Sequence, residues 1–151
     1  MSTNSIEDIQ HEIVEEFELF DDWTDRYEYI IDLGKKNPGL PDTDKLESNL
    51  IKGCQSQVWL VSKIEGGRVF FYGDSDAIIV KGLVSLLIRV LSGHLPQEIS
   101  TADLFFIEKI GMTHHLAQTR SNGLLSMVKQ MKFYALAYQA QQPEPQEPFN
   151  T

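Results

Sequence analysis

The chain has 151 residues, of which 42% are hydrophobic and 23% charged, a composition typical of one globular domain rather than of a disordered protein. Its 13 basic and 22 acidic residues give a net charge of −9, which argues against nucleic acid and anionic membranes as partners. The single cysteine, Cys54, excludes an internal disulfide and excludes a four-thiolate zinc or iron–sulfur site within one chain.

The distribution of apolar residues predicts a cytoplasmic protein. The first seventeen residues are acidic and lack the apolar core of a signal peptide. The longest apolar stretch, residues 78–91, contains Lys81 and Arg89 and is too short to cross a bilayer. We therefore expect no membrane segment.

Two amphipathic helices are predicted first. Ser5 and Asp8 have the spacing of a capping box, and apolar residues follow at helical spacing. A second helix is expected to begin after Asp22 or Thr24. Gly34 is expected to end it, as the C′ residue.

A hairpin is predicted after a long polar loop over residues 37–49. Residues 58–64 and 68–72 are rich in β-branched and aromatic side chains, as strands are. Between them lies Glu65-Gly66-Gly67, a hairpin turn sequence. Residues 74–76 (Asp-Ser-Asp) are then expected to cap a helix over 77–91, whose apolar character on all sides predicts a central, buried position.

The last third is predicted to be helical. Pro96 is expected to begin a short helix, Asp103 to cap another over residues 104–110, and Ser121 to cap a long final helix. Residues 1–140 are therefore expected to form one domain, with a disordered Pro-rich tail at 141–151. The order of elements predicts an α+β fold, with a small antiparallel sheet packed against several helices.

Cys54 lies between the polar loop and the first predicted strand. It is preceded by Gly53 and followed by polar residues rather than by an apolar stripe. A lone cysteine is commonly a small buried hydrophobe, and that remains one interpretation. Reactive cysteines, however, tend to lie on loops at the ends of rigid elements.

Three ordered sequence blocks resemble the SufE family of sulfur-acceptor proteins. The first is residues 53–59, GCQSQVW, which resembles the family signature around Cys54. The second is residues 73–77 continuing to 80–83, and the third is His115-Leu116 with residues 120–124. Trp23 and residues 27–34 also fit, so that the resemblance extends over about residues 5–139.

The resemblance implies a fold similar to that of the IscU and NifU scaffolds and a role in sulfur transfer. SufE-like proteins accept sulfur from a PLP-dependent cysteine desulfurase of the SufS type, stimulate it, and pass the sulfur to an iron–sulfur scaffold. Cys54 would be the acceptor and would carry a persulfide. One thiol suffices for such an exchange, and a second could release the sulfur by closing a disulfide. The chain would be an accessory protein without a cofactor or metal, not an independent enzyme.

Further residues are assigned to the site as expectations. Arg120 is expected to stabilise the thiolate or to contact the partner, and the alternative is a solvated charge. Asp76 and Lys81 are also expected at the partner surface. The alternative for Asp76 is a helix cap, and the alternative for Lys81 is a solvated surface charge. A last group is expected to support the cysteine loop: Gly53, Gln55, Ser56, Gln57 and His115.

Other functions remain open from the sequence. The partner could be a CsdA-like desulfurase in another sulfur-transfer pathway. In a different class, the chain could be a redox-sensing or purely interacting domain. An iron–sulfur scaffold is disfavoured because one thiol cannot hold a cluster. We expect a monomer or a weak homodimer.

Overall fold

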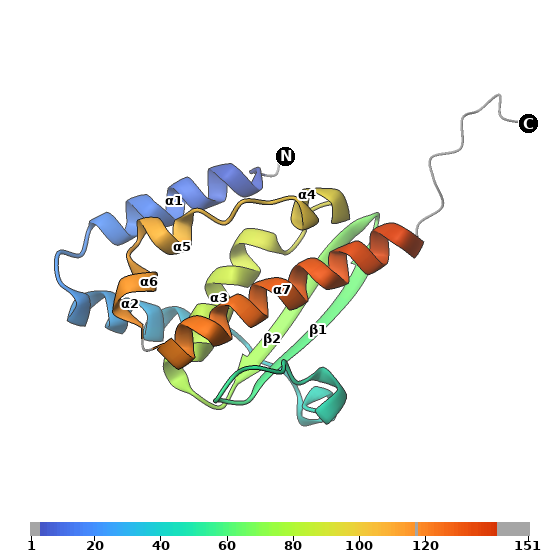
Figure 1. The fold of residues 1–151 in the computed structure, drawn as a ribbon, viewed down its shortest axis with the longest axis horizontal. Helices are drawn as coiled ribbons and strands as arrows, with labels where there is room; N and C mark the ends of the chain where they lie inside the picture. The colour runs from blue at the N-terminus through green and yellow to red at the C-terminus, as the bar shows by residue number, and fades with distance from the viewer. Residues whose placement is uncertain (1–3, 117, 142–151) are drawn as a thin grey trace, which may run out of the picture.

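A computed structural model describes residues 4–116 and 118–141, without the side chains of residues 118–122 (Figure 1). Seven helices and two strands are present in this part of the chain. The helices are α1 (Ile6–Glu18), α2 (Trp23–Lys36), α3 (Ile78–Leu91), α4 (Pro96–Ser100), α5 (Phe106–Lys109), α6 (Met112–His115) and α7 (Gln118–Gln141). The strands are β1 (Val58–Glu65) and β2 (Arg68–Ser75), and two 3-10 turns, η1 (Asp42–Asp44) and η2 (Glu47–Asn49), precede them.

The sheet is the predicted hairpin. β1 and β2 pair antiparallel, with Val58 opposite Ser75 and Glu65 opposite Arg68. Gly66 and Gly67 both have positive φ, 57° and 79°, as a tight turn between twisted strands requires. β2 continues to Ser75, three residues beyond the predicted end. The α+β class, with a small antiparallel sheet and several helices, is confirmed.

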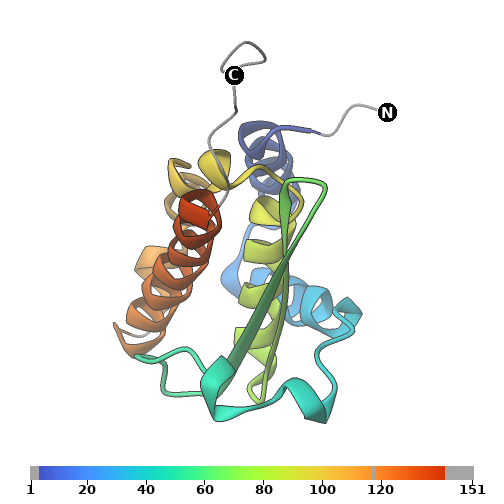
Figure 2. The ribbon, with the colours of Figure 1, turned by 90° about the vertical axis from the view of Figure 1, so that its right-hand side faces the viewer.

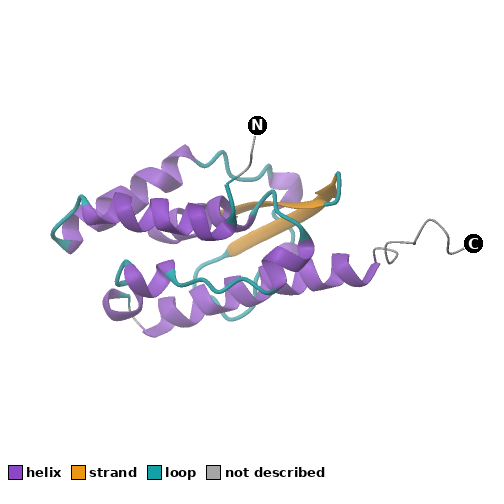
Figure 3. Cartoon of the chain, turned by 90° about the horizontal axis from the view of Figure 1, so that it is seen from above, coloured by secondary structure: helices purple, strands orange, loops and turns teal. Residues whose placement is uncertain are grey.

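α3 is the central helix, as its apolar sequence predicts. Nine of its fourteen residues are buried. It contacts α1, α2, α7 and β2, so that its sides face protein rather than solvent. α7 runs along one side of the molecule and α2 lies on the opposite side (Figures 2 and 3). No helix in the described ranges is long and apolar enough to cross a membrane.

Gly34 lies inside α2 and does not end it, which corrects the prediction. α2 continues to Lys36 and is capped at Asn37. Gly34 faces Gly82 of α3, and a Cβ on Gly34 would lie 2.7 Å from the Gly82 amide nitrogen. A Cβ on Gly82 would in turn collide with the Ile30 carbonyl. The two glycines therefore allow α2 and α3 to pack backbone to backbone.

The predicted starts of α1 and α2 are confirmed, and that of α5 is corrected. Ser5 and Asp8 form the predicted capping box, and Asp22 caps α2. Asp103 does not cap α5, which begins at Phe106. Gln10 of α1 binds this turn instead, since its side chain accepts from the Phe106 amide and donates to the Asp103 carbonyl, both at 3.1 Å.

α7 begins at Gln118, three residues before its predicted cap, so that Ser121 lies inside the helix. The short helix α6 was not predicted. Gln141 belongs to α7 rather than to the tail, and residues 142–151 lie outside the described residues.

Candidate functional site

Cys54 is half-buried in a loop between η2 and β1, where it faces α3 and α7. Its thiol donates to the Gly123 carbonyl on α7, with a sulfur–oxygen distance of 3.6 Å. A cavity of about 90 Å³ adjoins the sulfur. The cavity is lined by Cys54, Gln55 and Ser56 of the loop, Val80 and Leu83 of α3, and Gly123 and Met127 of α7.

Gly53 brings the loop close to α7. Its φ is +92°, which favours glycine, and a Cβ here would lie 2.6 Å from the Ser126 hydroxyl oxygen. On the facing helix, a Cβ on Gly123 would lie 3.4 Å from the Cys54 sulfur, in ordinary contact. The positive φ therefore favours glycine at position 53, and a larger residue there would also make the Ser126 side chain move.

The residues that are predicted to cap α3 mainly hold the cysteine loop, although Ser75 also accepts from the Ala77 amide at 3.2 Å. The Asp76 carboxylate accepts from the Gln57 amide at 3.1 Å, and the Ser75 hydroxyl donates to the Gln57 carbonyl at 2.8 Å. α3 begins after Ala77 without a side-chain cap. The prediction that these residues cap α3 is therefore wrong, because the chain just before β1 lies against them and takes their hydrogen bonds. Contact between Asp76 and a partner stays a prediction.

Asp74 is almost fully buried, at 5% exposure, and forms two ion pairs. Lys45 and Lys81 each place an ammonium within 3.4 Å of its carboxylate. Burial alone would raise the pKa of Asp74, but hydrogen bonds from the Leu40 and Ser75 amides, together with Lys81, hold the pKa below its ordinary value. Lys81 is thus engaged within the chain, and its partner contact stays a prediction.

The surroundings of Cys54 favour the neutral thiol. Burial raises the pKa of Cys54 above its ordinary value, since the thiolate would lose solvation. The thiol also acts as a hydrogen-bond donor to Gly123, a bond that the thiolate cannot form. We expected backbone amides or Arg120 to stabilise the thiolate. The resting geometry favours the protonated form, and the Arg120 side chain lies outside the described residues.

His115 contacts α2 rather than the cavity. Its ring stacks on Trp23, with ring centres 4.2 Å apart, and its carbonyl accepts from the Tyr27 hydroxyl. Its loop-supporting role stays a prediction. Within the described part of the chain, no group of three or more His, Cys, Asp or Glu side chains is placed to hold a metal ion.

The three sequence blocks converge at the Cys54 cavity. The lining takes residues 54–56 from the first block, Val80 and Leu83 from the second, and Gly123 from the third. Met127, one helical turn after Gly123, completes the lining. Sequence spacing did not predict this convergence, because Cys54 and Gly123 are 69 residues apart. The presence of three family blocks in one chain was the sequence feature that could have indicated that these segments meet.

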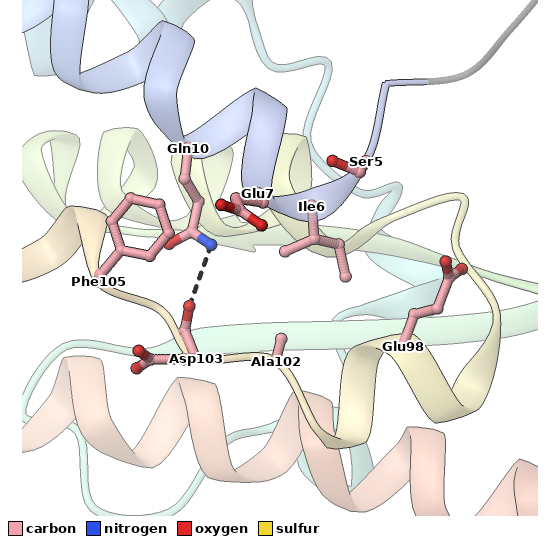
Figure 4. A pocket seen from close by; sticks show the side chains of 8 residues that line it. All are labelled: Ser5, Ile6, Glu7, Gln10, Glu98, Ala102, Asp103 and Phe105. Carbon is pink, nitrogen blue, oxygen red and sulfur yellow. Dashed lines mark hydrogen bonds between the residues drawn. The ribbon is translucent and has the colours of Figure 1, made fainter.

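A larger hollow, of about 450 Å³, lies between α1 and the chain around residues 98–105 (Figure 4). Glu7, Glu98 and Asp103 lie around it, and Ile6 and Phe105 supply apolar surface. None of the predicted site residues whose side chains are described lines it, and no residue is shared between its lining and that of the Cys54 cavity.

Comparisons with known proteins support the assignment of the family. The SufE family model, described as an Fe-S metabolism associated domain, matches residues 11–135. An uncharacterized SufE-like protein of Rhizobium meliloti is 41% identical over 126 residues, covering 80% of this chain and 90% of the relative. A second, from Rhizobium etli, is 44% identical over 126 residues, with coverages of 80% and 85%.

Further comparisons agree. An uncharacterized SufE-like protein of Synechocystis is 41% identical over 127 residues, covering 84% of this chain and 80% of the relative. The solution structure of a hypothetical protein from Thermus thermophilus has a TM-score of 0.72 and 21% identity, covers 87% of this chain and 96% of that one, and shows the shared fold. By the family model and by these relatives, the chain belongs to the SufE family of Fe-S metabolism associated domains.

Proposed function

We propose that this protein accepts sulfur on Cys54 from the persulfide of a PLP-dependent cysteine desulfurase of the SufS type. It stimulates that enzyme and delivers the sulfur to a scaffold for iron–sulfur cluster assembly in the cytoplasm. One observation carries the proposal: the only thiol of a SufE-family chain lies at a cavity lined by three separate segments. The chain is an accessory protein in this proposal, since its cysteine carries sulfur and the desulfurase supplies it.

The transfer is a thiol exchange without net oxidation. The Cys54 thiolate attacks the terminal sulfur of the donor's protonated persulfide, R–S–SH. A new sulfur–sulfur bond forms to Cys54, the bond between the two donor sulfurs breaks, and the donor cysteine leaves as a thiolate. The proton stays on the transferred sulfur. The rate depends on the thiolate fraction, the leaving group and access to the sulfur.

The resting geometry supports a sheltered acceptor. The Cys54 thiol is half-buried and neutral, so that it reacts slowly with solutes in this conformation. Docking must expose the loop, which also restores an ordinary pKa and raises the thiolate fraction. After transfer, return of the loop would place the persulfide beside the apolar side chains of Val80, Leu83 and Met127. Shelter of this kind would limit loss of sulfur to other thiols.

Three residues are proposed for the partner surface: Arg120, Asp76 and Lys81. Arg120 lies in the third block, one turn before the glycine that faces Cys54. Asp76 and Lys81 both belong to the chain that holds the cysteine loop closed. A partner that competes for these groups would open the loop as it binds.

Desulfurase turnover tests the proposal. Alanine formation by a SufS-type desulfurase with cysteine should rise when the wild-type protein is added and should not rise with Cys54→Ser. Excess Cys54→Ser should suppress stimulation by the wild type, since docking does not need the thiol. Equal stimulation by both proteins would contradict sulfur acceptance and favour a purely interacting domain.

The identity of the desulfurase is tested in the same assay. A CsdA-like enzyme is the second candidate partner, because the same exchange chemistry serves both. Stimulation of only the CsdA-type enzyme would move the protein to another sulfur-transfer pathway while keeping Cys54 as the acceptor.

A further inference from the structure

Residues 37–57 form one continuous segment between α2 and β1, with Cys54 near its end. In Figure 2 this segment runs below the sheet and reaches toward the start of α7. Its regular structure consists of two single 3-10 turns, which cannot hold it by themselves, and of a short bridge to β1, where Leu50 pairs with Trp59 and the Ile51 amide donates to the Val58 carbonyl at 2.8 Å. What fixes the segment is therefore its contact with the rest of the protein.

Three consecutive residues bond both ends of this segment. Asp74 accepts from the Leu40 amide at 3.0 Å, near the start. Ser75 and Asp76 bond Gln57 at the other end. The Asp74 carboxylate also accepts from the Ser75 amide at 2.8 Å, which connects the two anchoring points. Cys54 lies between these two attachments.

The start of the segment packs tightly on the Asp74 carboxylate. A Cβ on Gly39, whose φ is +72°, would lie 2.5 Å from a carboxylate oxygen, so that only a glycine allows this approach. Lys45, also in the segment, places its ammonium 3.4 Å from the same oxygen and 5.5 Å from the centre of the Trp59 ring. Trp59 is the cross-strand neighbour of Asp74.

Lys81 completes the charge balance from the α3 side, 3.3 Å from the other carboxylate oxygen. The buried carboxylate thus has four partners: two backbone amides and two ammonium groups. Two of these, the Leu40 amide and the Lys45 ammonium, belong to the segment that carries Cys54. Opening the segment would leave the buried charge without them, which is costly.

We infer that Asp74 is a positioning residue that holds the 37–57 segment closed and thereby limits the reactivity of Cys54. Asp74 would then control how often Cys54 becomes accessible. Only the role of this control in sulfur transfer rests on the proposed function. The consequence for the thiol itself holds with any reagent. A weaker anchor raises the population of the open segment, in which Cys54 is exposed and its thiolate forms more readily.

Alkylation of Cys54 by iodoacetamide, followed by intact mass, tests the inference without a desulfurase. Asp74→Asn removes the charge and leaves one acceptor oxygen, so that an amide hydrogen bond and both ion pairs are weakened. Since hydrogen bonds to charged groups are the stronger ones, we expect alkylation about tenfold faster or more. Lys45→Met, which removes one anchor from the segment side, should accelerate it by a smaller factor.

Two controls separate the anchor from general effects. Asp42→Asn is matched in chemistry: Asp42 lies 3.9 Å from Lys45, but its side chain is fully exposed, and the alkylation rate should not change. Val90→Ala removes buried side-chain volume from the last turn of α3, where Val90 is 0% exposed, and changes no residue of the 37–57 segment. It should lower the stability to urea and leave Cys54 slow to react.

The alkylation rates of these variants decide whether Asp74 holds the segment closed. A folded Asp74→Asn protein that reacts at the wild-type rate would overturn the inference, as would equal acceleration by Val90→Ala. If Asp74→Asn does not fold, Lys45→Met decides by the same criterion. Faster alkylation in a protein that never accepts sulfur would uphold the anchor and reject the proposed function.

Discussion

Replacing Gly82 by alanine should force α2 and α3 apart. The built Cβ on Gly82 meets backbone: it collides with the Ile30 carbonyl oxygen and lies 2.7 Å from the carbonyl carbon, well inside van der Waals contact. A side chain could rotate away, but a helix backbone cannot. The helices must therefore separate, and α3 carries Val80 and Leu83 of the Cys54 cavity.

The size of the effect follows from two opposing terms. Alanine is favoured over glycine inside a helix by about 1 kcal/mol. Overpacking a tight contact costs about 1–3 kcal/mol, and a clash with backbone belongs at the upper end. We expect Gly82→Ala to lower the free energy of unfolding by about 2 kcal/mol, which corresponds to a fall in Tm of about 4–8 °C for a chain of this size.

Urea unfolding followed by circular dichroism measures this, with Gly123→Ala as the matched control. The same change at Gly123, also inside a helix, places its Cβ at an ordinary 3.4 Å from the nearest atom. It should leave stability unchanged or raise it by up to about 1 kcal/mol. A Gly82→Ala protein as stable as the wild type would refute the close packing of α2 on α3.

Three further predictions concern the site and the packing of α1. Gly53→Ala should make Cys54 react faster with iodoacetamide, because alanine at φ +92° strains the closed loop by about 1–2 kcal/mol and so favours its open form. An unchanged rate would contradict the assigned loop geometry. The pH profile of Cys54 alkylation should have its midpoint above that of a peptide containing GCQSQ, since burial raises the pKa of the thiol, and coinciding profiles would mean an exposed thiol. Glu16→Gln should lower the free energy of unfolding by about 1 kcal/mol near pH 7. The reason is that Glu16 accepts two hydrogen bonds from Arg89, which also lower the pKa of Glu16. That contribution is present above about pH 4.5 and disappears as the pH falls through the lowered pKa, so that urea unfolding of wild type and variant should converge in acid; a constant difference would exclude the ion pair as its cause.

Local sequence signals predicted the elements they control. The capping box at Ser5 and Asp8 acts within one turn, and it is found where it was expected. The hairpin at Gly66 and Gly67 is equally local. Gly34 was misplaced because its role depends on Gly82, a residue of another helix. Spacing within one segment carries no information about such a crossing.

In the candidate site, too, local features were predicted from the sequence and long-range contacts were not. Cys54 could be identified from the residues around it and from the family signature. Asp74 and Asp76 were assigned to a helix cap because they precede α3 in the sequence, whereas in the fold a segment from residues 37–57 takes their hydrogen bonds. Met127 was not predicted, because the residues around it in the sequence give no sign that this helix packs against the loop of Cys54. Long-range contacts such as these are decided by packing.

Sulfur transfer to Cys54 can be measured directly as the mass of the protein after reaction with a persulfide donor. The purified chain is incubated with a SufS-type desulfurase, PLP and cysteine, and its intact mass and peptide masses are taken without reductant. Sulfur acceptance by Cys54 should add the mass of one sulfur atom, located on the peptide that contains Cys54 and absent in Cys54→Ser. An unchanged mass with desulfurases of both the SufS and CsdA types, each shown to be active, would contradict it.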